Sequence, residues 1–198
     1  MDYLTLMLFD LIKWTTALFL VVDPLGNVPV FIALTKNMSE NQRKKTFQSA
    51  IVTGLIVLLL FVFAGQQILL LFGISLSSFM VAGGLLLLII SIKLLISGSW
   101  QDYSISSESI GVVPIGFPLL VGPGAITTTI LILQSSGFLV TIFSVLITFV
   151  TVWLTLKYVN PIFKFLGKEG SLVVARLMAM FIAAIAIEYI VQGVKSLF

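Results

Sequence analysis

Two apolar segments of this chain each contain a cluster of helix-breaking residues near the middle, where a membrane helix should be most regular. The first cluster reads Asp-Pro-Leu-Gly-Asn-Val-Pro over residues 23–29, and the second reads Gly-Pro-Gly over residues 122–124, with Pro118 just before it. Proline removes a backbone donor and clashes with the preceding turn, while glycine adds conformational freedom. Inside lipid, a broken backbone must be covered by protein or must line a water-filled cavity. Two such breaks, one in each half of the chain, therefore indicate a ligand site near the middle of the membrane.

The composition is that of an integral membrane protein. Of the 198 residues, 59% are apolar and 10% are charged, and the mean hydropathy is +1.19. Soluble domains have about 45–50% apolar and about 25% charged residues. The net charge of +3 does not indicate nucleic-acid binding, because the basic residues cluster at the ends of apolar segments. No cleavable signal peptide is evident, so we expect the first apolar segment to stay in the membrane.

Six apolar stretches are long enough to cross a bilayer core, which requires about 20 residues per helix. They lie approximately at residues 14–35, 46–72, 77–97, 112–134, 138–158 and 171–194. Long runs with almost no charge are typical of membrane helices and not of the alternating pattern of barrel strands. We therefore expect an all-α integral membrane fold with six transmembrane helices, of which the first and the fourth are broken at the midplane.

The basic residues predict the orientation in the membrane. The first connection contains four of them between residues 36 and 45, and the fifth contains Lys164 and Lys168, whereas the second and fourth contain none. The excess of basic residues on cytoplasmic loops then places connections one, three and five inside and both termini outside. Lys13 and Lys195, which lie near the termini, argue weakly against this orientation. The expected location is the cell membrane, as a multi-pass protein.

The two breaks also relate the halves of the chain to each other. Residues 1–98 and residues 109–198 each contain one broken helix followed by two continuous helices, and the polar residues 99–108 connect them. Pro24 corresponds to Pro123, and each lies near the centre of its segment. Because three helices is an odd number, the second half must enter the membrane from the opposite side. This predicts an inverted repeat, a plan common in secondary transporters. Coincidence is the alternative, since prolines also form simple kinks in membrane helices.

Each break creates two helix ends of opposite polarity. The later half-helix presents free N–H groups and about half a positive charge, and the earlier one presents free carbonyls. A zwitterionic amino acid fits such a pair of ends, with its carboxylate on the N–H groups and its ammonium on the carbonyls. Gly26, Gly122 and Gly124 leave a narrow space beside bare backbone. The predicted ligand is therefore as small as glycine, alanine or serine.

Asp23 and Asn27 are the most distinctive residues of the first break. A carboxylate near the membrane centre costs about 2.5–3.5 kcal/mol or more, so such a group usually pairs, binds a cation or carries a proton. Asp23 is therefore a candidate partner for a ligand ammonium, or a coupling site for a proton or sodium ion. In the structural interpretation, which is compatible with these roles, the Asp23 side chain accepts hydrogen bonds from backbone N–H groups that the break leaves without partners. Asn27 is the natural N-cap of the following half-helix, whose first turn contains Val28 and Pro29.

The second break is followed by threonines. Gly124 or Ala125 opens the later half-helix, and Thr127, Thr128 and Thr129 lie in its first turns. Their hydroxyls either bind the ligand or donate to carbonyls one turn earlier, and for any one threonine the second interpretation is favoured.

Two further features have mainly structural interpretations. Gly83-Gly84 in the third helix permits close packing between helices, as small residues do in membranes. Arg176 in the sixth helix either extends to the cytoplasmic face or pairs with an acidic group near the site.

The residues present do not favour an enzyme. The chain contains no cysteine and no histidine, which removes thiolate chemistry, the usual proton shuttle and the commonest metal ligand. One central carboxylate supplies neither a nucleophile with its base nor a metal cluster. We therefore expect no catalytic residues, no metal and no cofactor. The alternative to a secondary transporter is an uncoupled channel or facilitator for small polar solutes, built on the same two breaks.

Both breaks belong to longer motifs. The first reads Asp-Pro-Leu-Gly-Asn-Val-Pro-Val-Phe over residues 23–31, and the second reads Phe-Pro-Leu-Leu-Val-Gly-Pro-Gly-Ala-Ile-Thr-Thr over residues 117–128. Together they resemble the MarC family, also called the small neutral amino acid transporter family, and the resemblance covers essentially the whole chain. It implies transport of glycine, alanine and similar amino acids, coupled to a proton or ion gradient. The family's motif residues correspond here to Asp23, Pro24, Gly26, Asn27, Pro29, Gly122, Pro123, Gly124, Thr127 and Thr128.

Overall fold

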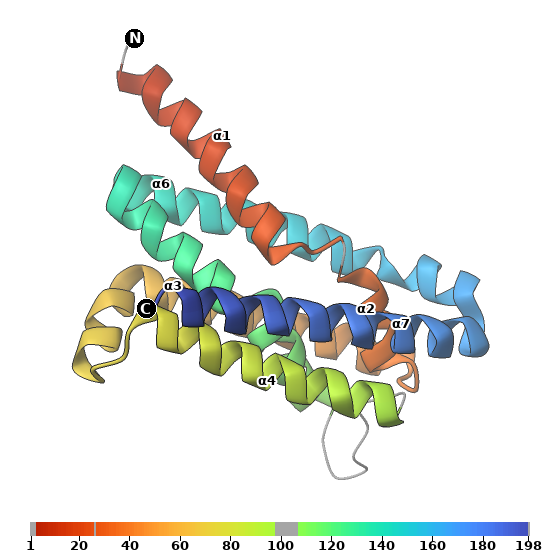
Figure 1. Ribbon diagram of the computed structural model, residues 1–198. Coiled ribbons are helices and arrows are strands. Elements are labelled where there is room, and N and C mark those ends of the chain that lie inside the picture. Colours follow the sequence, from red (N-terminus) through yellow and green to blue (C-terminus); the bar gives the residue numbers. More distant parts are fainter. Residues whose placement is uncertain (1–2, 26, 98–106, 198) are drawn as a thin grey trace.

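The computed structural model describes residues 3–25, 27–97 and 107–197, and each regular element in these ranges is a helix (Figure 1). The elements are α1 (Tyr3–Val22), α2 (Val28–Thr35), α3 (Glu40–Leu71), α4 (Leu76–Ser97), α5 (Ser107–Ile110), the π-helical segment η1 (Gly111–Leu120), α6 (Pro123–Lys157) and α7 (Val159–Lys195). The expected all-helical fold is therefore confirmed for this part of the chain. Most of the polar connection over residues 99–108 lies outside the described residues.

The helices and the surface are those of a membrane protein. Four helical stretches within the described ranges are long and apolar enough to cross a bilayer, namely Thr5–Val22, Glu40–Leu71, Leu76–Lys93 and Pro123–Lys157. Large apolar side chains also cover the outside of the molecule, where Leu71 is 82% exposed and Ile96 is 76% exposed. Apolar surface of this extent requires lipid or another partner to cover it. The count of six crossings stays a prediction.

Two helices begin earlier than the sequence suggested. The expected start of the first segment near Trp14 is wrong, because α1 begins at Tyr3 and is 20 residues long. Its two charged residues are accommodated in the helix, since Asp10 accepts a hydrogen bond from Ser136 and Lys13 lies over the Trp14 ring. The expected start of the last segment at residue 171 is also wrong, because α7 begins at Val159.

A sharp bend divides α6 into two legs. Gly137 has φ 78° and ψ −179°, which interrupts the helix and which glycine adopts without steric cost. The bend lies between the fourth and fifth segments expected from the sequence, so residues 123–136 and 138–157 form separate arms of the bundle (Figure 1).

The two halves of the chain are interlaced. The first helix, α1, packs on α6, which belongs to the second half, and η1 of the second half packs on α3 of the first. The most extensive contact joins α4 and α7, which run side by side in Figure 1. Glycines make this contact close, because a methyl group added at Gly84 would lie 2.7 Å from the Ala186 carbonyl oxygen. The prediction that Gly83-Gly84 permits close helix packing is confirmed.

A chain of side-chain hydrogen bonds joins α1 to the bend in α6. The Trp14 indole Nε1 donates to Ser136 Oγ at 2.8 Å, and Ser136 Oγ donates to Asp10 Oδ2 at 2.8 Å. Beyond the bend, Thr15 Oγ1 of α1 donates to Ser144 Oγ of α6 at 3.3 Å. These bonds give the half-buried carboxylate of Asp10 a donor from the facing helix.

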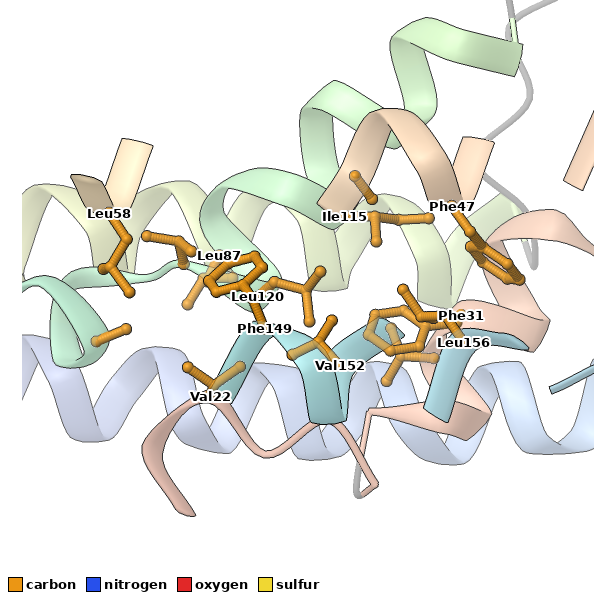
Figure 2. Packing of buried hydrophobic residues seen from close by; sticks show 14 of the residues in the cluster. Val22, Phe31, Phe47, Leu58, Leu87, Ile115, Leu120, Phe149, Val152 and Leu156 are labelled. Atoms are coloured by element: carbon orange, nitrogen blue, oxygen red, sulfur yellow. The ribbon is translucent and has the colours of Figure 1, made fainter. Parts of the chain in front are cut away.

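The apolar core lies where α2, α3, η1 and α6 meet. Figure 2 shows Phe31 of α2 and Phe47 of α3 close to Leu156 of α6, and the two aromatic ring centroids are 6.3 Å apart. Leu120, at the end of η1, is also fully buried in this cluster. The core therefore fixes the positions of α2 and η1, each of which flanks one of the breaks.

Candidate functional site

A cavity of about 340 Å³ lies where the two breaks approach each other. Its polar lining comes from Asp23 and Asn27 at the first break and from Tyr189 of α7. Pro118 and Leu119, at the end of η1, contribute the lining from the second break. The remaining lining side chains are apolar and come from α1, α2, α4 and α7, namely Val21, Val30, Leu87, Phe181, Ile182 and Ile185.

The first break places Asp23 in a left-handed backbone conformation. Its φ is 42°, which is uncommon for a residue with a side chain, although aspartate and asparagine adopt it more readily than most. The Asp23 N–H still donates to the Phe19 carbonyl at 2.8 Å, so α1 is hydrogen-bonded up to the break. The chain then turns through the buried Pro24. The conformation brings the Asp23 side chain to the wall of the cavity.

Asn27 does not cap α2 as expected. It has helical torsions, φ −79° and ψ −9°, and its side chain makes no cap hydrogen bond. Instead, its Nδ2 donates to the carbonyls of Val22 at 3.2 Å and Asp23 at 3.0 Å. Asn27 turns to α1 because of the backbone groups that lack partners at the two helix ends. The end of α1 has carbonyls without intrahelical donors, whereas the proline in the first turn of α2 has no N–H to be capped.

This arrangement changes what the first break offers to a ligand. An ammonium group was expected at the free carbonyls of the earlier half-helix, but two of the carbonyls at this end, those of Val22 and Asp23, already accept hydrogen bonds from Asn27. The Asp23 carboxylate and the Asn27 side-chain oxygen are therefore the groups at this wall of the cavity that suit a cation. Asn27 Oδ1 accepts no hydrogen bond from a residue that the structure describes.

The second break is longer than the Gly-Pro-Gly cluster indicated. The backbone is already extended at Val113 (φ −133°, ψ 123°) and Phe117 (φ −138°, ψ 130°), each of which precedes a proline. Proline disfavours the helical conformation of the residue before it. The sequence prediction named Pro118 but missed Pro114. A regular helix resumes only at Pro123, after an extended Gly122 whose position no side chain caps.

Tyr189 covers the glycines of the second break. A methyl group added at Gly124 would lie 2.7 Å from Tyr189 Oη and 3.2 Å from Val21 Cγ1, and both of these residues line the cavity. At Gly122, an added methyl group would lie 2.8 Å from the Pro118 carbonyl oxygen. Gly124 therefore leaves room for the tyrosine ring beside the backbone.

Pro123 and the threonines lie behind the cavity wall. Pro123 packs against Gly83 of α4, where a methyl group would overlap the proline ring. Thr127 Oγ1 donates to the Pro123 carbonyl at 2.7 Å, and Thr129 Oγ1 donates to the Ala125 carbonyl at 2.8 Å, as the structural interpretation of the threonines predicts. Thr128 has no hydrogen-bond partner among the described residues.

The predicted site residues are therefore close together but have different roles. Asp23 and Asn27 line the cavity, Gly124 contacts its lining residues, and Pro123 and Thr127 stabilise the second break. Gly26 lies outside the described residues. A direct role of these residues in ligand binding stays a prediction.

Tyr189 is the residue that the sequence prediction missed. It lies four residues after Ile185 and eight after Phe181, a helical spacing that places all three on one face of α7. A hydroxyl group on that apolar face is the signal from which it could have been found. Arg176, near the middle of α7, is exposed and forms no ion pair with a described residue. No group of three metal-binding side chains occurs in the ranges that the structure covers.

Comparisons with known proteins identify relatives that are similar over nearly their whole length. A family model described as MarC family integral membrane protein matches residues 8–198. The chain is 37% identical over 192 residues to a UPF0056 membrane protein of Archaeoglobus fulgidus, which covers 91% of this chain and 90% of the relative. It is 34% identical over 198 residues to the UPF0056 membrane protein YhcE of Escherichia coli, with 94% and 92% covered. No solved structure matches the chain.

Proposed function

The chain belongs to the MarC family of integral membrane proteins, and on that premise we propose that it is a secondary transporter of small neutral amino acids. The observation that carries the proposal is the cavity between the two helix breaks. Its volume of about 340 Å³ is near the lower end of the range of about 300–1,000 Å³ for small-molecule sites. Glycine, alanine and serine fit such a space.

The charges around the cavity match a zwitterion. In the proposal, Asp23 and the Asn27 side-chain oxygen bind the ammonium group. The carboxylate lies toward the start of α6, where Gly122 is uncapped and where a helix N-terminus favours negative charge. The Tyr189 hydroxyl donates to no described residue and supplies a further hydrogen bond to the carboxylate.

Coupling to a gradient rests on Asp23. Acidic residues in membrane segments mark ion pathways and proton relays, and Asp23 lies at the wall of the cavity. Alternating access then comes from the motion of one element of the inverted repeat against another around the cavity. The cell membrane, with connections one, three and five in the cytoplasm, is the proposed location.

The test is uptake of radiolabelled glycine, alanine and serine into proteoliposomes under imposed proton and sodium gradients. A transporter accumulates substrate above equilibrium when the coupling gradient is present, whereas an uncoupled channel only equilibrates it. Asp23→Asn should abolish accumulation while leaving the protein folded, because asparagine also tolerates a positive φ.

Asp10→Asn is the matched control. It removes the carboxylate within α1 but keeps an oxygen that accepts the hydrogen bond of Ser136. Its uptake should equal that of the wild type. Unchanged accumulation and unchanged ion dependence in Asp23→Asn would remove Asp23 from the coupling mechanism. Equilibration without accumulation in the wild type would favour the channel.

A further inference from the structure

A second and larger cavity lies apart from the site between the breaks. It is a groove of about 750 Å³ between the first turns of α3 and the last turns of α6. Two lysines line it, Lys44 from α3 and Lys157 from α6, which are far apart in the sequence. We propose that this groove binds an anionic phospholipid, whose phosphate lies between Lys44 and Lys157 and whose acyl chain follows the apolar part of the groove.

The two lysines are available to a ligand. Both are exposed, and neither forms an ion pair with a residue in the described ranges. Glu40 is the one carboxylate in the lining, so the groove has a net positive charge. Lys157 Nζ lies 4.9 Å from the centroid of the Trp153 ring, and this cation–π contact holds the ammonium group at the edge of the groove.

The apolar lining continues from the lysines toward the middle of the bundle. Phe47 and Ile51 follow Lys44 at intervals of three and seven residues along α3, and Leu156 faces them from α6. Phe47 and Leu156 are almost completely buried, and Ile51 is half-buried. Phe47 and Leu156 therefore form the floor of the groove, and Ile51 and Trp153 leave apolar surface on which one lipid chain can lie. A soluble phosphate would use only the charged end.

The position of the groove also fits a lipid. Lys157 is the last residue of α6 and Lys44 lies in the second turn of α3, so both are at the ends of stretches long enough to cross a bilayer. Trp153 adds an aromatic ring of the kind that is enriched at membrane interfaces. Basic pockets between helices at this depth bind anionic headgroups.

Delipidated protein in detergent, titrated with dioleoyl phosphatidylglycerol or dioleoyl phosphatidylcholine and followed by native mass spectrometry, tests the proposal. Phosphatidylglycerol should bind more tightly than phosphatidylcholine. Lys44→Gln and Lys157→Gln should each weaken its binding about fivefold, and the double variant about 25-fold, because one lysine near a charged surface contributes about 1 kcal/mol. The variant in which both Lys44 and Lys157 are replaced by arginine keeps the charge and should bind phosphatidylglycerol as tightly as the wild type does.

Lys13→Gln is the matched control, because Lys13 Nζ also lies over a tryptophan ring, 4.5 Å from the centroid of Trp14, but outside the groove. Its affinity for phosphatidylglycerol should not change. The proposal is overturned if the double glutamine variant keeps wild-type affinity or if both lipids bind equally. Displacement of the lipid by equimolar glycerol phosphate would also overturn it, since the ligand would then be a soluble phosphate.

Discussion

Replacement of Gly124 by alanine tests whether Tyr189 covers the second break. The added methyl group would lie 2.7 Å from Tyr189 Oη and 3.2 Å from Val21 Cγ1. Favourable contacts between heavy atoms are about 3.5–4.0 Å long, so the overlap with the hydroxyl is about 0.8 Å. Overpacking of this kind costs about 1–3 kcal/mol of unfolding free energy. We expect about 2 kcal/mol, because the tyrosine ring has to move into the cavity.

Tyr189→Phe removes the atom that is overlapped most. The hydroxyl has no partner among the described residues, so this change alone should alter stability by less than about 0.5 kcal/mol. In the double variant the nearest ring atom is Cζ, at 3.2 Å from the new methyl group, which leaves a much smaller overlap. The phenylalanine should therefore recover about 1 kcal/mol of the loss caused by Gly124→Ala.

The four proteins of this cycle are compared by reversible unfolding in mixed micelles of dodecyl maltoside and sodium dodecyl sulfate, followed by far-UV circular dichroism. Gly65→Ala is the control partner for Tyr189→Phe. Its methyl group would meet the Phe61 side chain at 3.0 Å, away from Tyr189, so these two changes should be additive. A coupling energy near zero between Gly124→Ala and Tyr189→Phe would refute the described packing of Tyr189.

Three other substitutions test separate contacts by the same unfolding measurement. Asn27→Ala removes the side-chain donor of the Val22 carbonyl, while the Asp23 carbonyl keeps the backbone N–H of residue 27, and should cost about 1 kcal/mol. A neutral result would mean that water replaces the amide. Ser136→Ala breaks both hydrogen bonds to α1 and should cost about 1–2 kcal/mol, with a shift of Trp14 fluorescence in a variant that retains only this tryptophan. Gly84→Ala pushes a methyl group against the Ala186 carbonyl and should cost about 1–3 kcal/mol, and wild-type stability would contradict the close contact of α4 with α7.

The sequence predicted the features that depend on local chemistry. Long apolar runs indicated membrane helices, and the proline and glycine clusters located both breaks, because these residues disrupt a helix whatever surrounds them. Asp23 and Asn27 were recognised for a similar reason, since polar groups in an apolar segment need a partner or a cavity.

The features that the sequence did not reveal depend on contacts between distant residues. The role of Asn27 follows from the carbonyls of Val22 and Asp23 at the end of α1 and not from its place before α2. Asp10 is acceptable inside α1 because Ser136 donates to it from another helix. Tyr189 lines the cavity because α7 lies against the second break. The spacing of residues along α7 indicates that they share a face, but not which part of the protein that face contacts.

The interlacing of the halves has a consequence for how the chain is made. Asp10 obtains its hydroxyl donor from Ser136, which is 126 residues further along the chain. At a synthesis rate of about 5–20 residues per second, the ribosome reaches Ser136 about 6–25 s after Asp10. During that interval α1 carries an unsatisfied carboxylate into the membrane and cannot form its native contact with α6. The first helix to be made is therefore among the last to be packed. Until then, the insertion machinery or the headgroup region has to keep the Asp10 carboxylate solvated.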